Sequence, residues 1–269
     1  MSGLRLRAER GVLSAVGGVL VAFLGLPLLS LFLGLGAEDF GIGLRHPLVW
    51  PALRLSLLTT SASLVVVVLL GTPLAWSLAR AKGRLARAVE TAVQLPIVVP
   101  PAVAGVALLL AFGRRGLGAG WLYPEGTSFS FTTAAVVMAE VFVSAPFFVQ
   151  AATSAFRRID GSLLVVARSF GASPLRVLLR IALPLAAPGL VAGAAMSWAR
   201  SLGEFGATLM FAGNLEGRTQ TLPLAIYTAL ESDMRAARAL SIVLVVVAFA
   251  LLLFVRGVLG RSTEPGARS

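Results

Sequence analysis

Six long apolar segments recur along this chain, and they restrict the folds open to it more than any other feature. A helix that crosses a membrane needs roughly 20 mostly apolar residues, and each of the six segments reaches that length. Because lipid offers no partners for unpaired backbone groups, each segment is expected to be helical. The predicted spans are residues 11–36, 55–79, 92–112, 132–155, 185–212 and 238–256.

The composition agrees with a membrane protein, since 57% of the 269 residues are hydrophobic and only 13% are charged. A soluble domain carries a charged fraction of roughly 25%. The chain has no cysteine, which excludes disulfides and thiol chemistry. It has one histidine, His46, so we expect no metal site built from histidines of a single chain.

The basic residues predict how the spans are oriented. With the N-terminus inside, fifteen of the 23 lysines and arginines fall in inside segments and seven in outside segments. This excess follows the positive-inside rule and accounts for most of the net charge of +11. We therefore predict an all-α integral membrane protein with one membrane domain over residues 1–269, both termini in the cytoplasm and no nucleic-acid partner.

The longest inside segment, residues 156–184, predicts a short helix, a turn and a second helix. Ser162 is expected to cap the first helix, and Gly171 to end it. Ser173 as an N-cap, with Pro174 in the first turn, predicts the second helix. This shape suits docking into the groove of a partner protein, and it suits equally an amphipathic segment that rests on the lipid surface.

The same segment carries a family resemblance. Gly171, nine intervening residues and Ile181-x-Leu183-Pro184 resemble the EAA signature of permeases from binding-protein-dependent ABC importers. In that family the segment contains the coupling helix, which inserts into a cleft on the ATP-binding subunit. The resemblance therefore implies ATPase contacts at Val165, Ala167, Arg168, Gly171, Ala172, Ser173, Ile181 and Pro184.

One position departs from the family pattern. Val165 stands where the family has a glutamate and Val166 where it has an alanine, so that only Ala167 matches. A carboxylate that could contact the ATPase is therefore missing. We expect coupling here to depend on shape and apolar contact, or on Arg168.

Two further stretches resemble the oxyanion branch of these permeases. They are Thr219-Gln-Thr-Leu-Pro-Leu-Ala-Ile-Tyr227 and Leu95-Pro-Ile-Val-Val-Pro-Pro101. Both look like the molybdate and tungstate type, and the first resembles it more than the sulfate type. The resemblance covers about residues 50–255 and implies import of molybdate or tungstate. Sulfate or thiosulfate is the alternative substrate.

Arg200 and Glu204 are charged residues inside the fifth predicted span, four positions apart, and are expected to pair on one helical face. Two interpretations stay open: a staple between helices, or a gate near the pathway where Arg200 offers positive charge to a passing dianion. Ser201 and Thr208 would then add weak hydroxyl contacts. Glu140, within the fourth span, is a third candidate.

The outer loop after the fifth span contains Arg218, Thr219 and Gln220. These residues are expected either to meet the extracytoplasmic binding protein or to form an ordinary solvated loop.

The family resemblance also implies the assembly. It implies the type I ABC importer permease fold and a homodimer in the cytoplasmic membrane of a bacterium or archaeon, with two ATP-binding subunits and one oxyanion-binding protein. The chain has no G-x-x-x-x-G-K-[ST] motif, so it is not expected to hydrolyse ATP or bind a cofactor. ATP and Mg²⁺ would be bound by the partner ATPase.

Three other classes of membrane protein fit less well. An ion-coupled secondary transporter would typically show buried carboxylates for ion coupling and lack the pattern from Gly171 to Pro184. A membrane enzyme would need a cluster of nucleophile, base or metal ligands, and a channel would need a filter-like ring. The sequence shows neither.

Overall fold

The computed structural model describes residues 2–33, 36–119 and 129–262. Every regular element in that part of the chain is helical, which confirms the all-α class. The helices are α1 (Ser2–Phe32), α2 (Ala37–Leu44), α3 (Val49–Arg80), α4 (Arg84–Val98), α5 (Pro101–Phe112), α7 (Thr133–Arg157), α8 (Gly161–Ser169), α9 (Pro174–Val177), the π-helical η1 (Leu178–Ala182), α10 (Leu183–Leu202), α11 (Gly206–Ala212), α12 (Leu222–Ser232) and α13 (Met234–Ser262).

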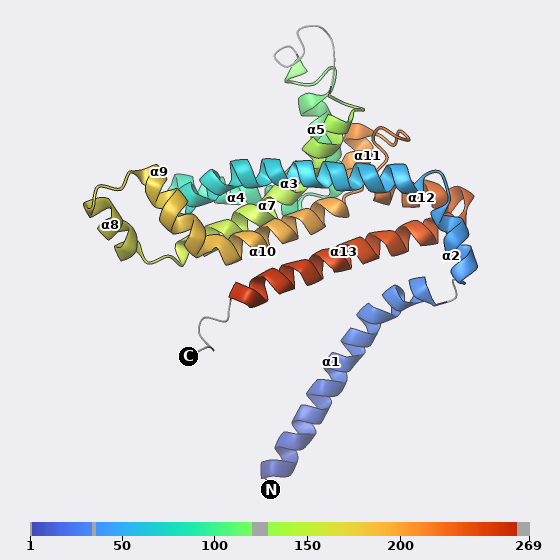
Figure 1. The fold of residues 1–269 in the computed structure, drawn as a ribbon, viewed down its shortest axis with the longest axis horizontal. Coiled ribbons are helices and arrows are strands. Elements are labelled where there is room, and N and C mark those ends of the chain that lie inside the picture. Colours follow the sequence, from blue (N-terminus) through green and yellow to red (C-terminus); the bar gives the residue numbers. More distant parts are fainter. Residues whose placement is uncertain (1, 34–35, 120–128, 263–269) are drawn as a thin grey trace.

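The long helices run side by side along the long axis of the molecule. Figure 1 shows α3, α4, α7, α10 and α13 in this direction, with α5 standing across them. Helices α8 and α9 lie at one end of the bundle, and α2 and α12 lie at the other. Helix α1 diverges from the bundle, and near its C-terminal end the guanidinium of Arg238 donates to the carbonyl of Ser30 at 2.9 Å.

Among the described residues, four helices are long and apolar enough to cross a membrane. They are Val49–Arg80, Thr133–Arg157, Pro174–Leu202 and Met234–Phe254. Helices α4 and α5 meet the same test as a bent pair, and Val16–Phe32 within α1 is a shorter apolar helix. Most large apolar side chains of that last segment are exposed, as a surface that lies in lipid would be. The chain is a multi-pass membrane protein.

The continuous helix predicted over 92–112 is wrong. Helices α4 and α5 meet at an angle of 116°, and the break falls at Val99 and Pro100, which both have extended backbone conformations. A proline disfavours the helical conformation in the residue before it. Because Pro100 and Pro101 follow each other, two consecutive residues are forced out of the helix.

The predicted span 185–212 is also displaced. One helix of 29 residues runs from Pro174 to Leu202, so it begins inside the segment assigned to the cytoplasmic loop. Gly203 is its C-cap, and α11 is a separate short helix. The helix widens to a π-turn over Leu178–Ala182. Pro184 explains this turn, since it has no N–H for the carbonyl of Arg180 and its ring crowds that carbonyl.

Small residues bring α7 and α10 into close contact. A Cβ placed on Gly189 would lie 2.5 Å from the Cβ of Ala155, and one on Gly193 would lie 2.8 Å from the Cβ of Ala151. Such small-residue contacts are typical of helix pairs in membranes. Around this contact a core of α3, α7, η1 and α10 forms from Val67, Ala75, Leu78, Phe148, Val149, Ala152, Phe156, Ala182 and Ala186.

Candidate functional site

Helix α8 begins at a cap that differs from the predicted one. Asp160, not Ser162, is the N-cap, and its carboxylate accepts a hydrogen bond from the backbone N–H of Ser162 at 2.9 Å. The backbone N–H of Ser162 and, to a smaller extent, its side-chain hydroxyl donate to this carboxylate, and both lower the pKa of Asp160. An ionised carboxylate accepts more strongly than a hydroxyl and suits the positive end of a helix, which explains why Asp160 prevails.

The end of α8 has the predicted glycine. Gly171 has φ +79°, and two backbone hydrogen bonds close the turn: Gly171 N–H to Arg168 C=O at 2.9 Å, and Ala172 N–H to Ala167 C=O at 3.1 Å. This is the Schellman pattern, in which glycine adopts the left-handed conformation at little cost. Ser173 then caps the next helix through the N–H of Arg176, with Pro174 at its first position, as predicted.

The two caps turn an apolar and basic surface outward at the end of the bundle. Phe170 is 87% exposed, and Val165, Val166 and Leu175 are also exposed. Sequence reasoning did not single out Phe170. The signal it offered is a large apolar residue directly before the glycine that ends a helix.

Of the other predicted contact residues, Arg168 and Ser173 are exposed and Ala167 and Ala172 are half-buried. Ile181 lies within the π-turn and Pro184 in the first turn of α10. Arg168 also lies close enough to Arg80, at the end of α3, for the two positive charges to repel each other. Arg80 itself stacks on Trp76, with its guanidinium carbon 2.9 Å from the ring centroid.

At the opposite end of α10, Arg200 and Glu204 form the predicted ion pair. Their Nη1 and Oε2 atoms are 2.7 Å apart. The expectation that both lie on one helix is wrong, because α10 ends at Leu202 and Glu204 lies in the break before α11. The other carboxylate oxygen of Glu204 accepts from the backbone N–H of Ala207 at 2.7 Å, so Glu204 holds the start of α11.

The two partners of this ion pair differ in exposure. The side chain of Arg200 is 28% exposed, whereas that of Glu204 is 1% exposed. Ser201 and Thr208 are buried inside the chain, where the Ser201 hydroxyl donates to the carbonyl of Trp198. Of the four predicted pathway residues, Arg200 therefore has the most accessible side chain.

Glu140 is a second buried carboxylate. It accepts a hydrogen bond from the hydroxyl of Thr59 at 2.8 Å, which joins α7 to α3. It also lies close enough to Glu204 for the two carboxyl groups to interact electrostatically. No group of three or more histidine, cysteine or acidic residues that could hold a metal occurs among the described residues.

The outer loop is folded on itself. Thr219 and Gln220 are buried: the Thr219 hydroxyl accepts from the N–H of Leu215 at 2.9 Å, and the Gln220 amide donates to Thr228 at 3.1 Å. The expectation of a solvated loop is wrong for these two side chains, and they are not available for contact with another protein. Arg218 is exposed.

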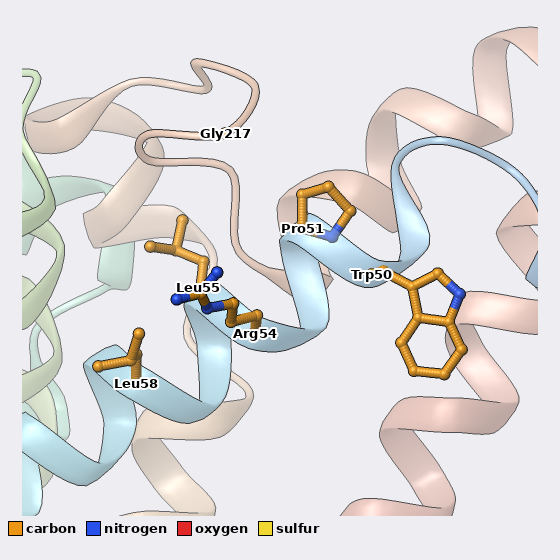
Figure 2. A pocket seen from close by; sticks show the side chains of 6 residues that line it. All are labelled: Trp50, Pro51, Arg54, Leu55, Leu58 and Gly217. Carbon is orange, nitrogen blue, oxygen red and sulfur yellow. The ribbon is translucent and has the colours of Figure 1, made fainter.

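A pocket of about 480 Å³ lies beside this loop. Gly217 of the loop and one face of α3 line it, and Figure 2 shows Arg54 between Leu55 and Leu58, with Trp50 directed away from them. Arg54 is one of the seven basic residues that the sequence places in outside segments. Its position beside Gly217 depends on the fold and places a second exposed positive charge near Arg218.

The arrangement of these helices resembles that of two solved ABC transporter structures. The same fold occurs in the crystal structure of a bacterial alginate ABC transporter (TM-score 0.73, 18% identity, 95% of this chain and 96% of that chain). It also occurs in the MetNI methionine ABC transporter (TM-score 0.60, 18% identity, 81% of this chain and 95% of that chain).

The family is shown by sequence. Residues 71–268 match the model of the binding-protein-dependent transport system inner membrane component, and the chain belongs to this family. A molybdenum transport system permease protein of Mycobacterium bovis is 46% identical over 241 residues, which cover 90% of each chain. A molybdate/tungstate transport system permease protein of Pyrococcus abyssi is 33% identical over 252 residues, 93% of this chain and 95% of that protein.

Proposed function

We propose that this chain is the membrane-spanning permease subunit of an ABC importer that moves molybdate and tungstate into the cell. The observation that carries this proposal is the 46% identity, over 90% of both chains, to a molybdenum transport system permease protein. The relative from Pyrococcus abyssi, whose name includes tungstate, supports the same substrate class. Sulfate or thiosulfate remains the alternative within the family.

The proposed topology has six crossings and both termini in the cytoplasm. The crossings are α1, α3, the bent pair α4–α5, α7, the helix 174–202 and α13. The arginines at the end of the bundle that carries α8 support the assignment of this end to the cytoplasm, since basic residues gather on that side of a membrane. Residues 1–269 then form one membrane domain.

The proposed assembly contains two copies of this chain, two ATP-binding subunits at the α8 end and one oxyanion-binding protein at the other end. The ATP-binding subunits bind ATP and Mg²⁺, and this chain is not itself catalytic. The surface around Phe170, Val165 and Arg168 is the proposed contact with the ATPase. This surface is apolar and basic, and it has Val165 where the family has a glutamate. We therefore propose that the matching cleft on the ATPase has an apolar centre and an acidic rim.

On the pathway we assign the main role to Arg200. Its partly exposed guanidinium offers positive charge to a tetrahedral dianion, while the ion pair with Glu204 moderates that charge. A weak site suits transport, since an ion that is held tightly is released slowly. Glu204, Ser201 and Thr208 shape the turn that presents Arg200. At the outer end, Arg218 and Arg54 are the proposed contacts for the binding protein.

Uptake by the reconstituted complex tests this proposal. The permease, its ATPase and its binding protein are placed in proteoliposomes, and uptake of labelled molybdate, tungstate and sulfate is measured with ATP and with a non-hydrolysable analogue inside. ATP-dependent uptake of molybdate or tungstate that unlabelled sulfate fails to suppress is expected. Preferential sulfate uptake would overturn the substrate assignment. Uptake driven by an ion gradient without ATP would overturn the transporter class.

A further inference from the structure

An apolar groove opens on the side of the bundle between α3 and the helix 174–202. Its volume is about 460 Å³. Leu69, Thr72 and Pro73 of α3 form one wall, and Leu179, Leu183 and Leu190 belong to the other. The hydroxyl of Thr72 donates to the carbonyl of Val68 within its own helix at 2.6 Å. The groove therefore offers its occupant an apolar surface.

The groove faces outward from the chain. Leu69 and Leu179, on opposite walls, are both exposed, although each is a large apolar residue. The two helices that form the walls are both long and apolar enough to cross a membrane. An apolar hollow on the flank of such helices faces lipid chains, which can fill it without any hydrogen bond.

Positive charge lies at one end of the groove. Arg180 directly follows Leu179 of the wall, and Arg176 precedes it by one turn; both side chains are exposed. Beyond Pro73, helix α3 continues to Trp76 and, one turn later, to Arg80, which stacks on the Trp76 ring. The arginines Arg157, Arg200 and Arg235 form ion pairs with acidic side chains elsewhere in the described chain.

We propose that this groove binds an anionic phospholipid. One acyl chain lies along the apolar walls, and the phosphate lies at Arg176 and Arg180. Charge complementarity carries this choice of occupant: a basic cluster next to an apolar groove between membrane helices matches a negatively charged headgroup attached to a hydrocarbon chain. A zwitterionic lipid would fill the groove equally well but would gain less from the arginines.

The site borders the π-turn of residues 178–182, because Leu178 and Leu179 also line the groove. A bound lipid would therefore contact the point at which the capped loop passes into α10. This inference goes beyond the proposed function, since it concerns the lipid and not the transported ion.

Native mass spectrometry of the full chain tests the proposal. The purified protein in mild detergent is titrated with dioleoyl phosphatidylglycerol or with dioleoyl phosphatidylcholine. We expect the anionic lipid to bind preferentially, and the preference to fall about fivefold for each arginine replaced in Arg176→Gln and Arg180→Gln. Leu179→Trp, which fills the groove, should weaken phosphatidylglycerol binding with both arginines present.

The matched control is the double variant Arg114→Gln, Arg115→Gln, which removes the same charge from the exposed turn that follows α5. It should bind phosphatidylglycerol as the unchanged chain does. Equal binding of the two lipids, or an unaltered preference in the Arg176→Gln, Arg180→Gln variant, would overturn the proposal. Release of the lipid by inorganic phosphate alone would show an anion site without an acyl-chain groove, which also contradicts it.

A second copy of the chain is the competing occupant. Because the chain has no cysteine, introduced cysteines react without background. Leu179→Cys in one copy and Leu24→Cys on the exposed face of α1 in another are oxidised in membranes. We expect little disulfide between them. Efficient cross-linking would show that a helix covers the groove and would overturn the lipid proposal, while leaving the proposed transport function untouched.

Discussion

Glu204 uses one carboxylate oxygen to pair with Arg200 and the other to accept the backbone N–H of Ala207, both at 2.7 Å. One buried side chain thus closes the turn between α10 and α11 and fixes the charged group next to it.

Replacing Glu204 separates its two tasks. Glu204→Ala leaves the buried N–H of Ala207 without its acceptor, which costs about 1–3 kcal/mol. Glu204→Gln keeps an acceptor and loses only the charge, so it should unfold at a temperature between those of Glu204→Ala and the unchanged chain. Thermal unfolding followed by tryptophan fluorescence measures this order. Equal midpoints for the two variants would contradict the proposed capping of α11.

The close approach of α7 and α10 predicts a strong effect of added volume. Gly193→Val places its side chain against Ala151 and should destabilise the chain by about 1–3 kcal/mol through overpacking. Gly25→Val in α1 is the matched control, because nothing lies within 4 Å of a Cβ at that position. The same unfolding assay compares the two variants. A similar loss in both would indicate helix propensity, not packing, as the cause.

The left-handed conformation of Gly171 predicts a graded series. A Cβ at this position meets no neighbour within 4 Å, so any effect comes from the backbone angle φ of +79°. Asparagine tolerates this region better than a β-branched residue. ATP-driven uptake in proteoliposomes should therefore fall in the order Gly171, Gly171→Asn, Gly171→Val. Membrane insertion, followed on an immunoblot, should be equal in all three; unaltered uptake by Gly171→Val would contradict the requirement for this turn.

Asp160 predicts a pH dependence at the start of α8. Its carboxyl has a pKa below the ordinary value of 3.8, because the ionised form accepts the N–H of Ser162. The cap therefore stabilises α8 fully above pH 3.8, and this support is lost as the pH falls through the lowered pKa. Hydrogen exchange of α8, corrected for the intrinsic pH dependence of exchange, should accelerate in that acidic range. Asp160→Asn, which keeps an acceptor but does not titrate, should remove the acceleration.

Proline shows which parts of the fold the sequence predicts. Pro73, Pro146 and Pro188 all lie within helices, where a single lost hydrogen bond is tolerated. The adjacent Pro100 and Pro101 break theirs, because each acts on the residue before it. Counting apolar residues finds the segments in both cases. Only the number and spacing of the prolines distinguish a continuous helix from one bent by 116°.

The sequence predicts those parts of the capped loop that are determined by residues close together in the chain. Gly171 and Ser173 act within a turn of their own positions, and both occupy the capping positions predicted for them. The burial of Thr219 and Gln220 depends on contacts inside a folded loop, and the place of Arg54 beside Gly217 depends on two distant segments meeting. Such contacts leave no periodic pattern in a single sequence.

The helix from Pro174 to Leu202 joins the capped loop to the Arg200–Glu204 turn without an intervening coil. With 29 residues it is about 40 Å long. A continuous helix resists compression along its axis, so its two ends tend to move together. We therefore expect a displacement of its first turn, next to Ser173, to move the Arg200–Glu204 turn as well. The π-turn of residues 178–182, where the helix is wider, is the place that could absorb part of this movement.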